Sequence, residues 1–414
     1  MANSFLTAQW VARKSLVLLH AKATAAARSN RNYQDEFRPI EGVPRGTTIN
    51  VRLPFRYTLR TGSAMVAQNS VQRYSALTLN NQNGVDINFS SIERAMDLGD
   101  FEEQVLEPAL AQVSAGIEGN ITALVTQIPK QVGTSSTSVT FTNVITARRF
   151  LSEALAPEGD NRTLLVSPQH NAELVTSNAA LYNPQVEIGD QWIEGIVASK
   201  VGGFMVVENT KIATYTTGTF GASTPIVSGS VTGNSGAGNA YASTMTLTMT
   251  GWASAGTTLT AGDVFTISAV YDVDPENKIS LGRLKQFVVT TQVSDTTGTV
   301  VATVAPCAIY GGAYQNVSAQ PLANAVVTVA SASDVTLKQS FAFYRDAILF
   351  ACVPMLDLSN TVKMCASESF DGFNLRFVQI YDADNDLLPG RIDTLSGEIL
   401  AYPELAVRVV GLPA

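Results

Sequence analysis

A stripe of seven apolar residues in the first third of the chain constrains the fold most strongly. The spacings of 4, 3, 4, 4, 3 and 4 positions are those of one face of an α-helix. The stripe consists of Leu106, Leu110, Val113, Ile117, Ile121, Leu124 and Ile128. We predict a helix from about residue 100 to 128, roughly 40 Å long, that ends at Pro129. Pro108 should kink or restart it, because proline lacks an amide hydrogen.

The second half of the chain contains two long segments without a charged residue. They cover residues 212–262 and 296–333, and Thr, Ser, Gly and Ala dominate them. The sequence between them, including "GDVFTISAVYDVDPENK" and "KQFVVTTQVSD", predicts short strands with turn residues at regular intervals. Helical and charged character returns at "TLKQSFAFYRDAILFACVP". We therefore predict that residues 212–333 form an all-β domain inserted into an earlier domain.

The N-terminal segment predicts an amphipathic helix. Residues 3–29 are rich in alanine, and Leu6, Trp10, Val17 and Ala21 share one broad helical face. We expect this face to be the one that packs against other elements.

Residues 47–90 favour strands and a long loop. In "TTINVRLPFRY", Ile49, Val51 and Leu53 alternate with polar residues. The segment "ALTLNNQNGVDINFS" contains Asn83 and Gly84, a pair typical of tight hairpin turns, so we expect a hairpin there. The intervening "TLRTGSAMVAQNSVQRYS" is polar and contains glycine, which predicts a long loop that reaches outward.

Residues 144–211 alternate between helix and strand patterns. "ITARRFLSEALAP" and "QHNAELVTS" predict helices, whereas "RTLLVSP" and "GFMVVEN" predict strands. This alternation predicts a compact α/β or α+β unit. Together with the inserted β-domain, it makes the whole chain α+β.

Positive charge is concentrated near the N-terminus. The net charge is −8, but residues 1–60 hold ten Arg and Lys against three acidic residues. A basic arm on an acidic body implies an acidic neighbour, such as another subunit, a partner protein or nucleic acid. The residues expected to face that partner are Arg13, Lys14, Lys22, Arg28 and Arg31.

Further arginines accompany the strand and loop region. Arg52, Arg56 and Arg60 are four residues apart, so on a continuous β-ribbon they would line one face. A solvated face is the simple alternative. We expect these three residues, and Arg73 in the same region, to form salt bridges between subunits.

The sequence carries no recognisable catalytic, cofactor or metal motif. Phosphate-binding and dinucleotide-binding glycine loops, the metalloprotease HExxH and the hydrolase GxSxG are absent. The three cysteines match no metal or disulfide spacing, and two histidines exclude a histidine-rich site. We therefore expect no enzyme activity, no cofactor and no bound metal. The chain contains no run of 18 apolar residues, so the sequence predicts no helix that spans a membrane.

The acidic stretch "DADND" at 382–386 resembles the start of a calcium-binding loop. That loop requires glycine at its sixth position and glutamate at its twelfth, which are Leu387 and Asp393 here. An EF-hand is thus excluded. We interpret the stretch as a turn before Pro389 that leads into two closing strands, "GEILAY" and "AVRVVG", with a break at Pro403.

Four stretches, taken in order, resemble the major capsid protein of tailed bacteriophages. They are "INVRLPFRY…ALTLNNQNGVDINFSSIERAMDLGDF", "VLEPALAQVSAGIEGNITAL", "FLSEALAPEGDNRTLLVSPQHNAELV" and "DTLSGEILAYPELAVRVVG". They are similar to that family's extended loop, spine helix, α/β segment and closing strands. The resemblance is to the HK97-type fold, and within it to P22-type coat proteins, which carry an inserted β-domain.

The resemblance implies a division into seven parts. These are an N-terminal helical arm (1–38), an extended β-loop (39–90), a peripheral domain with the spine helix (91–143), the first part of an axial domain (144–211), the inserted all-β domain (212–333), the second part of the axial domain (334–375), and closing strands of the peripheral domain (376–414). Pro108 would then be a hinge in the spine helix.

The resemblance also implies a function. Copies would assemble as hexamers and pentamers of an icosahedral shell around double-stranded DNA, within the host bacterial cytoplasm, and the shell would expand as DNA enters. Implied partners are a separate scaffolding protein, a portal protein, a decoration or cement protein, and DNA without sequence-specific contact. No lysine lies between Lys22 and Lys130, so a covalent cross-link from a loop lysine is not expected.

The sequence is also compatible with two other classes of protein. The Thr-, Ser- and Gly-rich segment 212–333 is also typical of a tail or surface adhesin, although the long amphipathic helix disfavours that class. A hydrolase that uses Asp382 to Asp386 is the third alternative, and it lacks a convergent motif.

Overall fold

A computed structural model describes most of the chain and divides it into two compact units. The described residues are 8–37, 46–69, 72–88, 102–177, 200–221, 224–229, 241–253, 256–355, 364–382, 387 and 389–413. Unit 1 comprises the described residues of Met1–Val51, Ser75–Thr122 and Ile348–Ile399. Unit 2 comprises those of Arg52–Tyr74, Ala123–Ala347 and Leu400–Ala414. Each unit is therefore assembled from segments that are far apart in the sequence.

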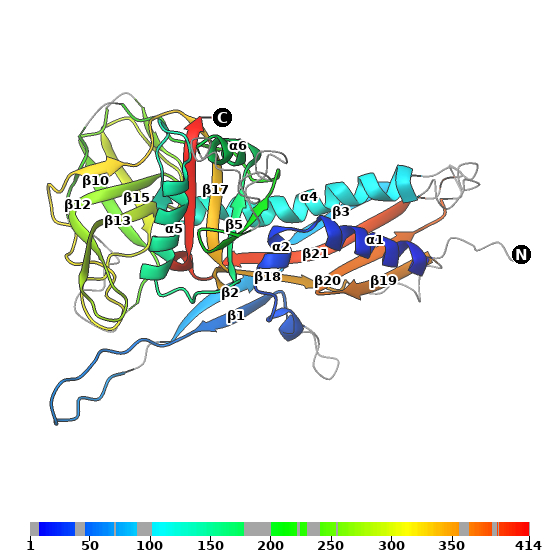
Figure 1. The fold of residues 1–414 in the computed structure, drawn as a ribbon, viewed down its shortest axis with the longest axis horizontal. Coiled ribbons are helices and arrows are strands. Elements are labelled where there is room, and N and C mark those ends of the chain that lie inside the picture. The colour runs from blue at the N-terminus through cyan, green and yellow to red at the C-terminus, as the bar shows by residue number, and fades with distance from the viewer. Residues whose placement is uncertain are drawn as a thin grey trace, which may run out of the picture. The chain divides into compact units, whose positions relative to one another are not determined.

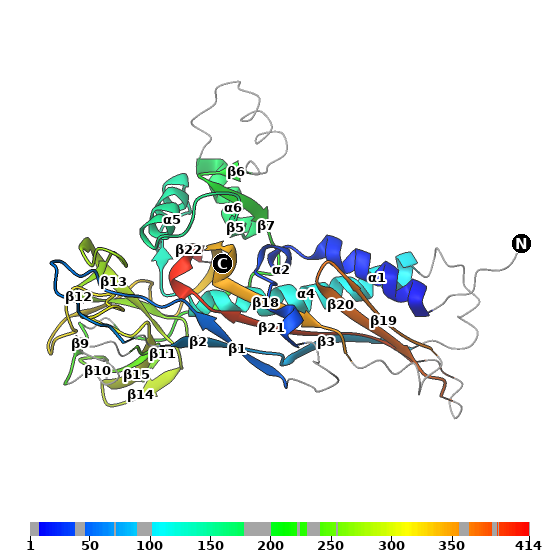
Figure 2. The same ribbon diagram turned by 90° about the horizontal axis from the view of Figure 1, so that it is seen from below.

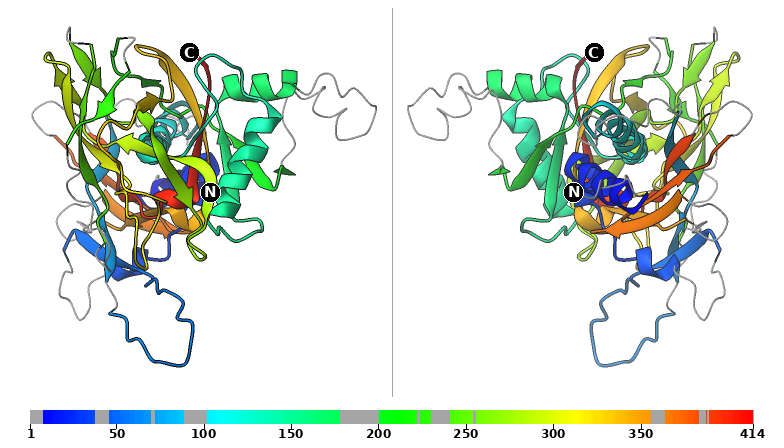
Figure 3. Two further views of the ribbon diagram at one scale, coloured as in Figure 1. Left: turned by 90° about the vertical axis from the view of Figure 1, so that its left-hand side faces the viewer. Right: turned by 90° about the vertical axis from the view of Figure 1, so that its right-hand side faces the viewer.

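Unit 1 is built on a five-stranded sheet. Its order is β18 (Ile348–Val353), β21 (Gly390–Leu400), β20 (Phe373–Gln379) and β19 (Met364–Phe370), and β3 (Asn81–Ile87) also pairs with β21. Helix α1 (Ala8–Lys22) packs on β19 and β20. Figures 2 and 3 show α1 and α4 (Glu107–Ala123) on the same face of this sheet.

The predicted N-terminal helix is confirmed, but its buried face was predicted wrongly. The segment forms α1 and the short α2 (Ala25–Arg28), which are separated at residues 23–24, and η1 (Gln34–Phe37) follows. Val17 is 55% exposed, whereas Val11, Leu16 and Leu19 are buried. The buried face lies on the other side of the helix, where Ala12 and Ser15 join Val11, Leu16 and Leu19, and their small side chains allow close packing on the sheet. Leu6 of the expected face lies outside the described residues.

The spine helix confirms the predicted stripe. All seven apolar residues of the stripe are buried. The helical segment begins with a π-helical turn, Glu102–Leu106, continues as α4, and ends in the 3-10 turn η4 (Leu124–Gln127). The regular α-helix thus restarts beside Pro108. Pro108 cannot donate a backbone hydrogen bond, and the π-helical turn lies just before it in the chain.

The predicted hairpin turn at Asn83–Gly84 is wrong, although the neighbouring strands are confirmed. β1 (Thr48–Leu53) pairs with β2 (Arg73–Thr78), and Val51 and Leu53 are buried as their alternation predicts. Gly84 instead lies inside β3, opposite Asp393 of β21. A Cβ at residue 84 would lie 2.4 Å from Oδ1 of Asp393 and 2.7 Å from the carbonyl oxygen of Ile392. Glycine is required there for close strand approach rather than for a turn.

Unit 2 contains a seven-stranded mixed sheet. Its order is β4 (Gln131–Val132), β22 (Ala406–Pro413), β17 (Thr336–Tyr344), β5 (Arg162–Val166), β7 (Phe204–Glu208) and β6 (Lys200–Val201), and β8 (Tyr215–Thr216) pairs with β17. Helices α5 (Phe141–Glu153) and α6 (Pro168–Ser177) pack against it. The helix and strand predictions for 144–211 are thus confirmed within the described residues (Figure 1).

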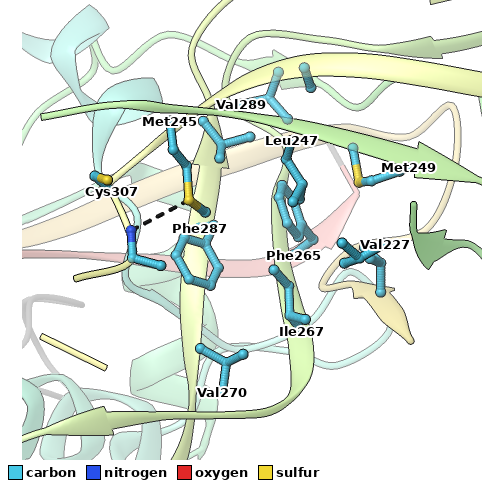
Figure 4. Packing of buried hydrophobic residues seen from close by; sticks show 14 of the residues in the cluster. Val227, Met245, Leu247, Met249, Phe265, Ile267, Val270, Phe287, Val289 and Cys307 are labelled. Carbon is cyan, nitrogen blue, oxygen red and sulfur yellow. Dashed lines mark hydrogen bonds between the residues drawn. The ribbon is translucent and has the colours of Figure 1, made fainter. Parts of the chain in front are cut away.

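A second sheet of unit 2 is formed entirely by residues 226–329. Its order is β16 (Val327–Val329), β12 (Val264–Val273), β13 (Ser280–Val289), β15 (Thr299–Ala305), β10 (Met245–Thr250) and β9 (Ile226–Val227). A two-stranded sheet, β11 (Thr257–Leu259) with β14 (Val293–Asp295), accompanies it. Figure 4 shows its own apolar core, in which Leu247, Phe265 and Phe287 pack together. The all-β character predicted for this segment is confirmed for the residues that the structure describes.

The two C-terminal strands are confirmed, but they do not close one domain. We expected residues 376–414 to complete the peripheral domain. Instead β21 belongs to the five-stranded sheet and β22 to the seven-stranded sheet. The 3-10 turn η7 (Pro403–Leu405) separates them, because proline restricts the backbone at the predicted break. The short turn η6 (Arg345–Ala347) likewise separates β17 from β18.

Candidate functional site

The loop between β1 and β2 is held in shape by its own side chains. Its described residues 54–69 form no helix or strand. The amide group of Gln68 takes the place of a strand partner for Thr58: its Oε1 accepts from the Thr58 N–H at 2.8 Å, and its Nε2 donates to the Thr58 carbonyl at 2.7 Å. Nearer the tip, Arg60 donates to the carbonyl oxygens of Gly62 and Ala64. The loop is therefore preorganised despite its lack of regular structure.

Large apolar side chains are exposed at the tip of this loop. Leu59 is 92% exposed, Met65 87% and Val66 65%. Each would release about 1.5–3 kcal/mol if it were fully buried. Exposed apolar residues that gather on one element are typical of surfaces that contact other proteins. Figure 1 shows the loop as the blue trace that continues beyond β1 and β2.

The structure does not line up the three regularly spaced arginines on one strand face. β1 ends at Leu53, so only Arg52 lies on a strand, where it is exposed. Arg56 instead pairs with Glu404 of the same chain, and Arg60 holds the loop tip. The alignment was wrong because Pro54 follows the strand and cannot donate the next ladder hydrogen bond.

Arg73 was expected at a subunit contact, and within this chain it is almost completely buried. It begins β2 and is 7% exposed. Its guanidinium carbon lies 4.9 Å from the ring centres of both Tyr241 and Tyr314.

Two residues of the basic arm contact the hairpin formed by β19 and β20. Arg13 pairs with Glu368 at 3.1 Å. Arg31 donates to Asp371 in the hairpin turn, and its guanidinium also lies 5.5 Å from the ring centre of Phe373. His20 approaches the same Asp371 carboxylate at 2.8 Å. Hydrogen bonds from His20 and Arg31 hold the pKa of the Asp371 carboxyl below its ordinary value.

The remaining basic residues of the arm lie closer to solvent. Lys14 is exposed and lies 5.9 Å from the ring centre of Trp10, Lys22 is exposed, and Arg28 is half-buried. The arm thus has one face bound to its own sheet and another that carries accessible positive charge.

Sequence reasoning missed a charge network in unit 2. Asp272 on β12 accepts from Arg283 at 2.6 Å and from Lys285 at 2.8 Å, both on β13, and Arg283 also pairs with Glu153 of α5. Burial would raise the pKa of Asp272, but Lys285, Lys130 and Arg283 together lower it to about 2. Burial lowers the pKa of nearby Lys130 to about 8, although Asp272 opposes that shift.

A sequence signal for this network did exist. Arg283 and Lys285 are two residues apart on a strand, so they share one face, and they lie between the two uncharged segments. Two cations on one face of a strand indicate an ion pair with an acidic residue on a neighbouring strand, which here is Asp272.

Neither a metal site nor a membrane helix is found in the described part of the chain. It contains no group of three or more His, Cys, Asp or Glu side chains that could hold a metal ion. None of its helices is both long and apolar enough to cross a membrane. Asp384 and Asp386 of the acidic stretch lie outside the described residues, and Asp382 and Leu387 exchange backbone hydrogen bonds.

Comparisons with known proteins find one matching family model and several solved phage structures. A family model described as "P22 coat protein - gene protein 5" matches residues 73–411. No curated protein matches the sequence significantly. A solved structure from Mycobacterium phage Che8 is 10% identical with a TM-score of 0.47, over 94% of this chain and 90% of that chain. The capsid structure of Cyanophage P-SCSP1u is 11% identical with a TM-score of 0.44, over 89% and 84%.

One solved structure corresponds to part of the chain. The CUS-3 coat protein I-domain is 26% identical with a TM-score of 0.21, and the similarity covers 26% of this chain and 96% of that chain. The family model, in contrast, spans most of the sequence. The chain therefore belongs to the P22 coat protein family, and it is a structural, non-enzymatic protein of a phage capsid shell with an α+β fold of the HK97 type.

Proposed function

We propose that copies of this chain assemble as hexamers and pentamers of an icosahedral shell that encloses a double-stranded DNA genome. A separate scaffolding protein guides assembly in the host bacterial cytoplasm, and the shell expands afterwards. A portal protein occupies one vertex, a decoration or cement protein binds the outside, and DNA is packaged without sequence-specific contacts. Family membership supports this proposal, and the observation that carries it is the preorganised loop with its exposed apolar tip.

The loop tip suits contact with a neighbouring copy. Leu59, Met65 and Val66 would leave water on assembly, which favours association. In a closed symmetric shell the same contact is repeated at every subunit, so a modest interface stabilises the whole particle. Among the arginines, Arg52 and Arg60 would form the intersubunit pairs, and their exposure supports this role. Arg56 and Arg73 have their contacts within the chain.

The arm and the spine helix have proposed roles in assembly and expansion. The accessible charges of Lys14, Lys22 and Arg28 face the scaffolding protein, DNA or a neighbouring subunit. The junction of the π-helical turn with α4 at Pro108 is the hinge. Reconstructions of precursor and mature shells test the hinge, and an identical bend at residues 102–110 in both shells would contradict it.

Mutation of the loop tip tests the proposed assembly. The double variant L59S/M65S is expressed with the head proteins of the parent phage and examined by negative-stain microscopy and sedimentation. Wild type should form shells, and the variant should remain as unassembled subunits. The matched control is L322S, since Leu322 is also exposed, at 67%, but lies outside the loop. A shell yield in L59S/M65S equal to that of L322S would refute the role of the loop tip.

A further inference from the structure

The base of the loop carries a buried cation that lacks an anionic partner. Arg73 is 7% exposed, yet its Nε has no hydrogen-bond partner, and its Nη2 reaches only the Pro54 carbonyl at 3.4 Å. No carboxylate among the described residues pairs with it. A buried guanidinium is costly unless its donors are satisfied, since its charge has lost the solvation of water.

Two tyrosine rings stabilise the charge of Arg73 but cannot satisfy its donors. The guanidinium carbon is 4.9 Å from each ring centre, and the centres of Tyr241 and Tyr314 are 5.4 Å apart. These three distances form a nearly equilateral triangle, so the rings lie side by side rather than on opposite faces of the guanidinium. Ring faces attract the cation, whereas the N–H groups in the guanidinium plane still need acceptors.

Arg73 lines a cavity with an excess of positive charge. The cavity has a volume of about 190 Å³. Its charged lining residues are Arg56, Arg73, Lys130, Arg283, Lys285, Asp272 and Glu404. Asp272 is already bound by Arg283 and Lys285, and Glu404 by Arg56. The two carboxylates are therefore occupied, and the positive charge of Arg73 is left uncompensated.

The cavity walls define the class of ligand. Tyr241, Tyr314, Tyr402, Phe150 and Leu53 give it aromatic and aliphatic surface beside the cations. The volume exceeds that of a single water site several times over. A guanidinium fork fits the paired oxygens of a carboxylate or phosphate better than it fits chloride.

We propose that this cavity binds a small oxyanion, with Arg73 as the ligand that fixes it. The oxyanion is either the carboxylate of an acidic side chain or free phosphate. Leu53, Arg56 and Arg73 belong to the loop and its flanking strands, whereas Tyr241, Tyr314 and Lys285 belong to the segment that contains the six-stranded sheet. The bound oxyanion joins these two parts of unit 2 and steadies the base of the loop.

Thermal unfolding and calorimetric titration of the full-length chain test the site. Sodium phosphate and sodium acetate are each compared with sodium chloride at equal ionic strength and pH. Phosphate stabilises many proteins by general exclusion, so the informative quantity is the difference between variants. A specific site predicts a saturable rise in the melting temperature of wild type, and a dissociation constant at least about tenfold weaker in R73Q. R52Q, in which an exposed arginine of the adjoining strand is changed, should bind as wild type does.

The outcomes distinguish a side-chain carboxylate from free phosphate as the occupant, and they also show whether the proposal fails. Saturable binding of acetate identifies a side-chain carboxylate as the natural occupant, and binding of phosphate alone identifies the free ion. If R73Q does not unfold cooperatively, R73K replaces it, because lysine retains the charge without the fork. The proposal is overturned if neither anion gives saturable binding to wild type, or if the Arg73 variant binds as tightly as R52Q. Neither outcome depends on whether the chain forms shells.

Discussion

The carboxylate of Glu118, in the middle of α4, accepts a hydrogen bond from the backbone N–H of Ala25 at 2.8 Å and so caps the first turn of α2. It also accepts from the N–H groups of Ala26 and Thr24 and from the Thr24 hydroxyl. Thr24 makes no side-chain cap of its own. A residue 93 positions away therefore satisfies the amides that α2 leaves open, and it places negative charge at the positive end of that helix.

Removal of this cap should destabilise unit 1. Glu118 is 2% exposed, so E118A leaves several buried donors without an acceptor. We expect E118A to lower the free energy of unfolding by roughly 2–4 kcal/mol, and E118Q by about half as much, because an amide retains one acceptor. Urea denaturation monitored by circular dichroism measures both changes. The control is E107Q at an exposed position of the same helix, and a loss in E118A no larger than in E107Q would show that the cap contributes nothing.

Two glycines of unit 1 should respond in opposite directions to substitution by alanine. In G84A the new methyl group would meet the Ile392 carbonyl and the Asp393 carboxylate, which already pairs with Arg376 at 2.9 Å. The backbone cannot yield without disturbing the strand pair, so G84A should cost about 1–3 kcal/mol.

The matched variant is G119A in α4. A Cβ at residue 119 has no atom within 4 Å, and alanine favours helix by about 0.5–1 kcal/mol relative to glycine. G119A should therefore raise the urea midpoint, whereas G84A lowers it. The same sign of change in both variants would contradict the close approach at Gly84.

Acid should weaken unit 2 through His170. This side chain is fully buried, its Nδ1 lies 2.7 Å from Oγ of Ser340, and burial lowers the pKa of His170 to about 4, with Glu173 opposing weakly. The unfolded chain has a histidine pKa near 6.5, so between pH 6.5 and pH 4 it binds a proton that the folded chain does not. Stability is therefore unaffected above about pH 7, and it falls by up to roughly 3 kcal/mol as the pH drops from 6.5 to 4.

H170Q removes this proton-binding group. Urea midpoints measured from pH 4.5 to pH 7.5 should fall less steeply with acid in H170Q than in wild type, even if H170Q is less stable at neutral pH. H20Q is the control, since His20 is the only other histidine and it belongs to unit 1. Parallel acid slopes in wild type and H170Q would exclude His170 as the acid-sensitive group.

Periodicity in the sequence predicted most elements, but not always their faces or neighbours. The helical character expected at "TLKQSFAFYRDAILFACVP" was wrong, because this segment forms the strands β17 and β18. The stripe from Leu106 to Ile128 was predicted and is buried throughout, because one long helix needs only its own spacing to define its face. The face of α1 was predicted wrongly, since apolar residues lie on both sides of this helix and only its packing on β19 and β20 decides which side is buried. The loop arginines were misaligned, because equal spacing on a strand has meaning only where the strand continues.

Some relationships exist only after the chain has folded. The adjacent pair Asn83 and Gly84 predicted a turn, and no local sequence pattern showed that Asp393 would lie against Gly84. No sequence pattern distinguished Glu118 from the other residues of the spine helix, and Arg73 was expected at a contact between subunits. Their partners come from segments tens to hundreds of positions away, so no local pattern encodes them.

The sequence by itself determined the helical spine, the α+β class and the all-β character of the segment predicted as 212–333, because these depend on the repeat of apolar residues along a short segment. Only the tertiary structure decided that Glu118 caps α2, that Gly84 lies close against Asp393, and that Arg73 is buried beside two tyrosines. The physical reason is that hydrogen bonds, close approach and desolvation depend on distances in space, which the order of residues does not contain.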